Sequence, residues 1–408
     1  MIKDKHIIYA QPGFFSLYKK CTYAIKQGVI FFLMFFICCT MLAGIAQADT
    51  SEADPCQSFG DLIRNTKVEN AIQQTGNYAR RADVHAFAQR VAACYQLNPS
   101  WVSDILAQAN YQASTVKFIM PQPAGTRNWQ NFRGSFLHPN RIRAGVRFWR
   151  DNQHLLERAQ ATYGVPPEIV MGILGVETTF GQVTGNFRII DALATLSFDF
   201  PEGRSDRTDY FSQELAQFLA FAANQQIDPL SIRGSYAGAM GMPQFMPSSL
   251  VNYGVDFDQD GKIDLHNSTA DIIGSVANYL AQYGWQAGLD PVLPVTLHST
   301  TQQDIAALKE PDIVPSFTAE QMALHGVIVD TDVAHWPHIL SEKLSFIILE
   351  NGADNVPDYV AGTQNFFVIT RYNRSSFYAM TVIELGRAIA NARSGTTMQA
   401  TLPSKRRP

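Results

Sequence analysis

Residues 166–181 read PPEIVMGILGVETTFG, and this stretch decides what the surrounding chain must form. Two prolines followed by a long apolar run predict a buried helix, because proline is well tolerated only in the first helical turn. Glu177 follows Leu174 by three residues and Ile173 by four, so it shares their apolar face. Burial raises the pKa of a carboxyl group, which makes Glu177 a candidate proton donor at neutral pH.

Glycines accompany this helix at positions 172, 175 and 181. A residue without a side chain lets another chain or a ligand approach the backbone closely. The ordinary alternative for Glu177 is a glutamate that ends a core helix and is salt-bridged or turned outward. The sequence downstream weighs against this alternative.

Residues 234–249 read GSYAGAMGMPQFMPSS, and we call this stretch the irregular wall. Small residues alternate with large ones and two prolines interrupt any regular element, a pattern that suits a backbone wall beside a cleft. Ser235 and Gln244 supply hydroxyl and amide groups of the kind that bind sugar hydroxyls and N-acetyl groups. Taken alone, both would be ordinary turn residues.

Composition excludes two broad classes of protein. The chain has 408 residues, of which 46% are apolar and 17% charged, so it is too apolar to be disordered. Its net charge of −4 and the lack of a basic block in the folded part argue against nucleic-acid binding. At about 150 residues per domain, the length predicts two or three structural units.

The N-terminus indicates export. Lysines precede the apolar run 28–45, which leads into the small-residue cleavage pattern Ala-Gln-Ala at 46–48. We therefore expect residues 1–48 to be a cleaved secretory signal, with an uncleaved membrane anchor as the alternative. Cys38 and Cys39 raise lipid attachment as a third possibility, but the residues before them fit a lipidation site poorly.

Two cysteines remain after such cleavage. Cys56 and Cys94 can pair in an exported protein and so tie an N-terminal arm to a helix. The alternative for Cys94 is a plain core position, because its surroundings have an apolar helical pattern.

The periodicity predicts a mainly α protein with one β-rich stretch, an α+β class. Helical patterns cover the following ranges: 84–94, 142–163, 166–181, 210–225, 270–283 and 378–392. Between about 289 and 370 the chain changes to short β-rich runs, split by Pro, Gly and Asn. These runs are Val292–Leu297, Val327–Val329, Leu344–Leu349 and Phe366–Thr370.

Together the two quoted segments resemble the lytic murein transglycosylase B family. The resemblance extends to the stretches DALATLSF at 191–198, YFSQEL at 210–215, GSVANYL at 274–280 and ITRYNRS at 369–375. It covers roughly residues 80–393 and implies a periplasmic bacterial enzyme with a lysozyme-like catalytic core that cleaves the glycan strands of peptidoglycan. On this basis the expected units are residues 1–48 (signal peptide), 49–164 (N-terminal helical region), 165–288 (catalytic lysozyme-like core with an EF-hand-like loop), 289–366 (β-rich insertion), 367–393 (return to the core and C-terminal helix) and 394–408 (tail).

A single carboxylate is expected to do the chemistry. Glycosidases normally place two carboxylates across the bond, yet near Glu177 the sequence offers only Glu168, on another helical face. Asp191 and Glu214 are more distant candidates. The resemblance implies that Glu177 acts first as acid and then as base without a catalytic cofactor, and that the products have 1,6-anhydromuramoyl ends.

The resemblance also assigns substrate-binding residues. Those expected to line the glycan cleft are Ser235, Gln244, Tyr279, Tyr372 and Asn373. Arg207 is expected to face peptide carboxylates, although residues 201–208 are longer than the family's usual stretch. For each tyrosine the alternative is a half-buried core aromatic.

Residues 256–264 read DFDQDGKID and resemble an EF-hand loop, with oxygen ligands at positions 1, 3 and 5 and glycine at 6. Asn267 stands at position 12 in place of the usual glutamate. The family supplies the last acidic ligand later, a role that Asp271 would fill, one residue out of register. The expected ligands of a structural Ca²⁺ are Asp256, Asp258, Asp260, the Lys262 carbonyl, Asp264 and Asp271.

Three rival functions remain at this point. A hydrolytic muramidase would use the same cleft and Glu177 with water as nucleophile, and would leave reducing ends. A non-catalytic peptidoglycan-binding protein would be expected to have lost the acid. A calcium-dependent signalling protein would need paired EF-hands, whereas one loop is present. We expect a monomer whose partners are peptidoglycan glycan strands.

Overall fold

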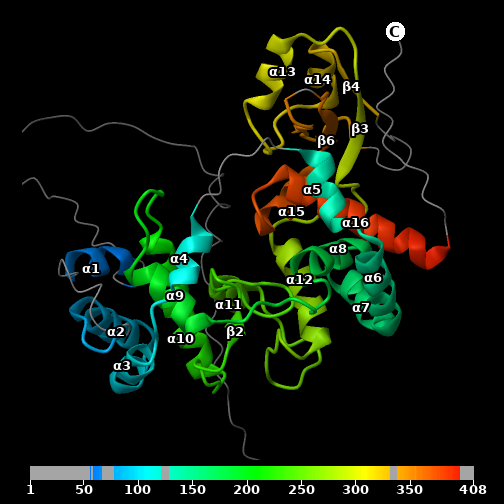
Figure 1. Cartoon of the computed structure of the whole chain (residues 1–408). Coiled ribbons are helices and arrows are strands. Elements are labelled where there is room, and N and C mark those ends of the chain that lie inside the picture. The colour runs from blue at the N-terminus through cyan, green and yellow to red at the C-terminus, as the bar shows by residue number, and fades with distance from the viewer. Residues whose placement is uncertain are drawn as a thin grey trace, which may run out of the picture. The chain divides into compact units, whose positions relative to one another are not determined.

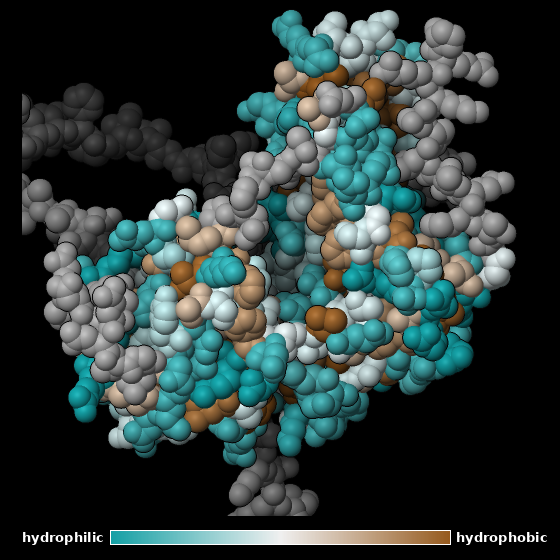
Figure 2. Space-filling view, viewed as in Figure 1, coloured by the Kyte–Doolittle hydropathy of each residue, from teal (hydrophilic) through white to brown (hydrophobic). Residues whose placement is uncertain are grey.

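The computed structural model describes residues 56, 58–66, 78–120, 128–330, 338–353 and 355–395. The predicted signal peptide and nearly all of the predicted tail lie outside these residues. The described part contains sixteen α-helices and six short β-strands, so the chain is mainly helical, as predicted. None of the described helices is long and apolar enough to cross a membrane. Hydrophilic residues cover most of the face in Figure 2, and hydrophobic ones form small separate areas.

Seven helices precede the segment that carries Glu177. They are α1 (Phe59–Thr66), α2 (Ala82–Tyr95), α3 (Pro99–Ala107), α4 (Ala113–Ile119), α5 (Trp129–Phe136), α6 (Pro139–Asp151) and α7 (Gln153–Tyr163). A disulfide between Cys56 and Cys94, with 5.7 Å between their Cα atoms, ties the segment before α1 to α2. The helical pattern over 142–163 is divided at Asn152, where α6 ends and α7 begins.

The core around Glu177 combines segments from the middle and the end of the chain. Its elements are α8 (Pro167–Thr178), β1 (Phe187–Arg188), α9 (Ile189–Phe198), α10 (Thr208–Asn224), β2 (Arg233–Gly234), α11 (Pro247–Tyr253), α12 (Thr269–Gln282), α15 (Gln364–Tyr372) and α16 (Ser376–Ser394). Helix α8 begins with proline in its first turn, as predicted, and most of its residues are buried. It packs along α16, and the two helices lie together in Figure 1.

Glycines bring the backbones of α8 and α16 into direct contact. A Cβ atom on Gly172 would lie 2.1 Å from the carbonyl oxygen of Val382, and one on Gly386 would lie 2.0 Å from that of Glu168. Only glycine fits at such distances. The close approach expected at Gly172 is therefore made by the C-terminal helix, and it fixes how α16 sits on α8.

A four-stranded antiparallel sheet with two helices forms a separate small core. Its strands, in the spatial order β4-β3-β6-β5, are β4 (Val327–Val329), β3 (Val292–Leu297), β6 (Asp358–Gly362) and β5 (Ser345–Leu349). Helices α13 (Gln302–Lys309) and α14 (Ala319–Leu324) belong to the same part of the chain, as Figure 1 shows. Leu308 and Met322 from these helices are fully buried with Val327 and Phe346 from the sheet.

Three of the four predicted β runs are strands, and the fourth prediction is wrong. Phe366–Thr370 lies within helix α15, whose N-terminus is capped by the Thr363 side chain. Phe366 and Ile369 are three residues apart and both are fully buried, which is a helical spacing. The β-branched residues Val368 and Ile369 favour a strand locally, but burial against the core decides for the helix.

We expect Gly386→Ala to lower the free energy of unfolding by about 1–3 kcal/mol, because its methyl group would overlap the backbone of α8. Gly134→Ala in α5 is the matched control, since a Cβ there meets nothing within 4 Å. The control should be neutral or gain about 0.5–1 kcal/mol. Urea unfolding of both variants measures the difference. Equal stabilities would show that α8 and α16 are not in backbone contact.

Candidate active site

Glu177 lies in the last turn of α8 and is partly exposed, while the residues around it on the helix are mostly buried. Tyr378, a buried residue of α16, donates its hydroxyl hydrogen to Oε1 of Glu177 at 2.6 Å. The glycine contact between the two helices thus places a neutral donor against the carboxylate. This hydrogen bond fixes the orientation of Glu177 without adding a charge.

Burial raises the pKa of Glu177 to about 7, and the hydrogen bond from Tyr378 opposes this rise. The predicted elevation of this pKa is confirmed. A group with a pKa near neutrality exists in both protonation states at physiological pH. Glu177 can therefore donate a proton in one step and accept one in the next.

The turn after Glu177 is strained and firmly held. Thr179, Phe180 and Gly181 have φ values of 52°, 59° and 82°, so three successive residues adopt the left-handed conformation, which is costly except for glycine. The Thr178 hydroxyl donates to the carbonyl of Met242 at 2.9 Å and accepts from the Gly181 amide at 3.0 Å. These bonds connect the Glu177 turn to the irregular wall.

The irregular wall has the broken backbone that its sequence predicted, and its two polar candidates brace it. The Ser235 hydroxyl accepts hydrogen bonds from the amides of Ala237 (3.3 Å) and Ala239 (2.9 Å). The Gln244 side-chain amide donates to the carbonyl of Thr184 at 3.0 Å, across the loop that follows α8. Both side chains are partly exposed, and the wall that they brace is joined to the turn after Glu177 by the bond from Thr178 to Met242.

The two tyrosines expected to contact the glycan differ in exposure. Tyr372 is partly exposed, donates to the carbonyl of Pro243 at 2.5 Å, and stacks on Tyr378 with ring centroids 6.4 Å apart. Tyr279 is only 5% exposed and donates to the carbonyl of Arg371 at 2.7 Å. Its ring packs 4.9 Å from that of Tyr372, so Tyr279 supports Tyr372 from behind.

Asn373 and Arg207 lie at the ends of helices. Asn373 is exposed and ends α15, directly after Tyr372. Arg207 precedes α10, with its guanidinium group 4.3 Å from the ring centroid of Tyr210. This stacking orients a partly exposed cation at the start of the helix.

The other carboxylates that the sequence offered hold the backbone. Asp191 accepts a hydrogen bond from the Asn110 amide at 3.0 Å and pairs with Arg188 at 3.2 Å. Glu214 accepts from both the amide and the hydroxyl of Ser248, at 2.8 and 2.6 Å. Both acids are buried. Their hydrogen bonds already have structural roles, whereas the carboxylate of Glu177 binds one neutral hydroxyl.

The comparisons with known proteins agree with this geometry. Residues 79–387 match the family described as Transglycosylase SLT domain. The chain is 36% identical over 361 residues to membrane-bound lytic murein transglycosylase B of Escherichia coli (strain K12), covering 85% of this chain and 92% of that protein. The chain belongs to the lytic murein transglycosylase family. It is thus a member of a family of peptidoglycan-cleaving enzymes, as its motifs predicted.

Two solved structures of lytic transglycosylases are similar over most of the chain. The Escherichia coli enzyme Slt35 in complex with calcium is 37% identical, has a TM-score of 0.67, and covers 80% of this chain and 98% of its own. SltB3 of Pseudomonas aeruginosa in complex with NAG-anhNAM-pentapeptide is 27% identical, has a TM-score of 0.64, and covers 79% of this chain and 82% of its own.

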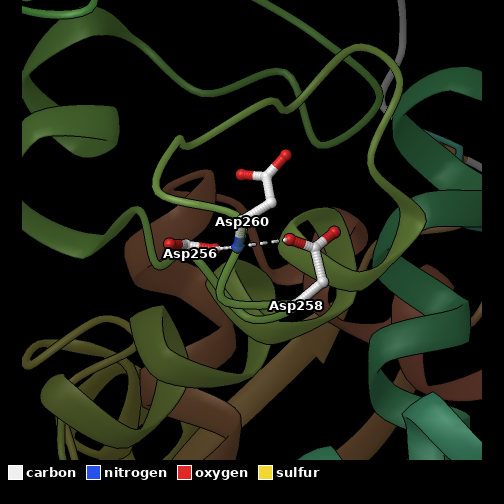
Figure 3. Close-up of side chains that lie close together, drawn as sticks. All are labelled: Asp256, Asp258 and Asp260. Atoms are coloured by element: carbon white, nitrogen blue, oxygen red, sulfur yellow. Dashed lines mark hydrogen bonds between the residues drawn. The ribbon is translucent and has the colours of Figure 1, made fainter.

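The EF-hand-like loop of this transglycosylase gathers three of its predicted ligands. Carboxylate oxygens of Asp256, Asp258 and Asp260 lie within 4.8 Å of one another. Because Ca²⁺–O distances are about 2.4 Å, one ion can reach all three. Asp256 and Asp258 both accept from the Asp260 amide, at 3.0 and 3.3 Å, as Figure 3 shows. Three clustered anionic oxygen donors suit a hard cation such as Ca²⁺.

The remaining predicted ligands hold the loop itself. Asp271 is 1% exposed and accepts hydrogen bonds from the amides of Phe257 (2.7 Å) and Asp264 (2.9 Å). Asp264 in turn accepts from the amide of Asn267 at 2.9 Å. Lys262 donates its amide hydrogen to Asp260 at 2.9 Å. Asp264 and Asp271 therefore brace the loop around the three-aspartate cluster.

Tyr378 is the functional residue that sequence reasoning missed. It lies five residues beyond Asn373, past the end of the quoted family motif. In the sequence it looks like a core aromatic between Phe377 and Ala379. The one available signal was the polar hydroxyl, which a buried tyrosine must satisfy with a partner.

We expect Tyr378→Phe to raise the pKa of Glu177 above about 7, because the hydrogen bond that favours the charged carboxylate is lost. The alkaline limb of kcat/KM should then move to higher pH, since the acid stays protonated longer. Tyr253→Phe is the control, because it removes a tyrosine hydroxyl that hydrogen-bonds to Tyr283 at 3.0 Å and not to Glu177. An unmoved limb in Tyr378→Phe would contradict this assignment.

Proposed function

We propose that this chain cleaves peptidoglycan glycan strands by intramolecular transglycosylation, with Glu177 as its sole acid and base. The observation that carries the proposal is the isolated, partly exposed Glu177 carboxyl group, with a pKa of about 7 and a neutral donor at 2.6 Å. Family membership supports the substrate class. The commitment of Asp191 and Glu214 to backbone hydrogen bonds supports a mechanism with one carboxylate.

In the first step Glu177 donates its proton to the glycosidic oxygen between N-acetylmuramic acid and N-acetylglucosamine. The bond from that oxygen to the muramoyl anomeric carbon breaks, and the bonding pair leaves with the oxygen. Glu177 is then a carboxylate, which the Tyr378 hydroxyl stabilises. It accepts the proton of the muramoyl 6-hydroxyl as that oxygen bonds to the anomeric carbon. The product is a 1,6-anhydromuramoyl end, and no water is consumed.

The same proposal gives roles to the residues around Glu177. Ser235, Gln244, Tyr372 and Asn373 would contact the glycan, with Tyr279 behind Tyr372. Arg207, held on the ring of Tyr210, would pair with a carboxylate of the peptide stem. The SltB3 complex with NAG-anhNAM-pentapeptide supports a substrate that carries both sugars and peptide.

We expect the purified protein to cleave peptidoglycan into fragments with two properties. Each fragment should lack one water molecule relative to the corresponding hydrolysis product, and it should resist reduction by borohydride. Mass spectrometry of the released fragments measures both properties. Glu177→Gln should fold and bind the glycan but release nothing. Reducible ends would show that water is the nucleophile, as in a muramidase. Full activity of Glu177→Gln would exclude Glu177 as the acid.

The three-aspartate cluster is proposed to hold a structural Ca²⁺. Asp256, Asp258 and Asp260 would bind the ion, with the Lys262 carbonyl as a further oxygen ligand. Asp264 and Asp271, which also accept hydrogen bonds from backbone amides, would complete the set of ligands. The bound ion would neutralise three crowded carboxylates and so stabilise the loop before α12. The Slt35 structure in complex with calcium supports this choice of ion.

Ca²⁺ should stabilise the folded protein by mass action and so raise its melting temperature. At a concentration one hundred times Kd, the gain in the free energy of unfolding is about 2.7 kcal/mol. EDTA should reverse this effect. The melting temperature of the double variant Asp256→Asn/Asp260→Asn should change neither with Ca²⁺ nor with EDTA. Differential scanning fluorimetry with Mg²⁺ as the comparison ion measures the shifts. A melting temperature unaffected by EDTA and Ca²⁺ would contradict the calcium site.

We further propose that the chain acts outside the cytoplasm as a monomer. The Cys56–Cys94 disulfide supports this location, because such bonds persist in oxidising compartments. The Escherichia coli relative is named as membrane-bound, which agrees with a place at the cell wall. Residues 1–48 would direct export, either as a cleaved signal or as a retained anchor.

A further inference from the structure

Three aromatic side chains from separate segments meet on the surface. Phe118 of α4 lies 5.5 Å from Tyr236 and 6.2 Å from Phe187 between ring centroids, and the rings of Phe187 and Tyr236 are 6.5 Å apart. Phe118 is 47% exposed and Tyr236 is 36% exposed. We call these three residues the aromatic platform. Aromatic side chains that gather at one place on a protein surface are candidates for a binding site.

The fold assembles the platform on the ladder beside the irregular wall. Phe187 of β1 pairs with Gly234 of β2, two residues before Tyr236, and this pairing brings the two aromatic residues close together at the ladder. Tyr236 stands in the turn that Ser235 closes, where the Gly238 amide donates to the Ser235 carbonyl at 3.2 Å. The platform is thus continuous with the wall, which is hydrogen-bonded to the turn after Glu177.

Backbone hydrogen bonding limits how far the platform lies from the carboxylate. The chain reverses directly after Glu177, because the Val183 amide donates to the Thr178 carbonyl at 3.0 Å. The four residue-to-residue steps from Val183 to Phe187 span at most roughly 14 Å when fully extended. A glycan bound at Glu177 therefore reaches the platform within a few sugar units.

We propose that the aromatic platform is a distal subsite that stacks on a sugar ring of the glycan strand. This inference rests on the proposed function, since it extends the same substrate away from the cleavage point. Sugars present apolar C–H faces that pack on aromatic rings, and their hydroxyls stay in water at a half-exposed site. Three side chains are far fewer than the 20–30 residues that each partner contributes to a stable protein interface. The size and the continuity with the wall favour a sugar over a protein.

A remote subsite affects long substrates and leaves short ones unchanged, because only long strands reach it. Binding energy from a remote part of the substrate can raise kcat/KM at the reacting bond. The platform would thus favour intact strands over the short fragments that cleavage produces.

The test compares long glycan strands with a fragment too short to extend beyond the residues around Glu177. We expect Phe118→Leu/Tyr236→Leu to lower kcat/KM for long strands about tenfold, equivalent to about 1.4 kcal/mol, with no change for the short fragment. Leucine keeps an apolar side chain but removes the ring faces. Tyr236→Phe, which keeps the ring, should retain activity. Leu324 of α14 is 83% exposed and lies outside the platform. Leu324→Ala is therefore the control for the loss of an exposed apolar side chain.

Binding of the chain to peptidoglycan is measured separately from cleavage. This measurement tests the aromatic platform even if the proposed function is wrong. Co-sedimentation with insoluble peptidoglycan uses the Glu177→Gln chain with and without the two leucine substitutions. Weaker binding of the leucine variant supports the platform, even if the native chain showed hydrolysis in place of transglycosylation. Equal binding, or an equal loss of activity on long and short substrates, would overturn it.

Discussion

Backbone contact between α8 and α16 is the constraint on which the site depends. Gly172 and Gly386 remove the side chains that would separate the two helices, and the carbonyl groups of Val382 and Glu168 occupy that space. At this separation the Tyr378 hydroxyl reaches Glu177. A longer distance between the helices would admit water to the carboxylate, and hydration would return its pKa toward the ordinary range.

The electrostatics of the site are unusually simple. Burial and one neutral hydroxyl set the pKa of Glu177. A cation at hydrogen-bonding distance would have lowered this pKa and kept the carboxylate charged. Tyrosine hydroxyls supply the polar structure instead, since Tyr279 and Tyr372 each donate to a backbone carbonyl. Burial raises the pKa of both tyrosines, so these groups remain neutral donors while Glu177 titrates.

Local patterns in the sequence predicted the structural features that are set by residues close to one another in the chain. Four features were predicted in this way: the start of α8, the apolar surroundings of Glu177, the broken backbone of the irregular wall, and three β-strands. Tyr378 was not, because its partner lies 201 residues away and no local spacing reveals it. The strand prediction for 366–370 failed for a related reason, since tertiary burial outweighed β propensity. In the aspartate loop, the spacing predicted the ligand types but could not show that Asp264 and Asp271 also accept hydrogen bonds from backbone amides.

The separation of Glu177 from Tyr378 also bears on how the protein acquires its activity. Contacts between residues far apart in sequence form late in folding, because a long loop must close first. Helix α16 follows the other described elements in the chain, so ribosomes synthesise it after them. A nascent or truncated chain would have the carboxylate but lack the helix that shields and orients it. The capacity to cut a cell wall would therefore arise only once α16 has been made and has packed on α8.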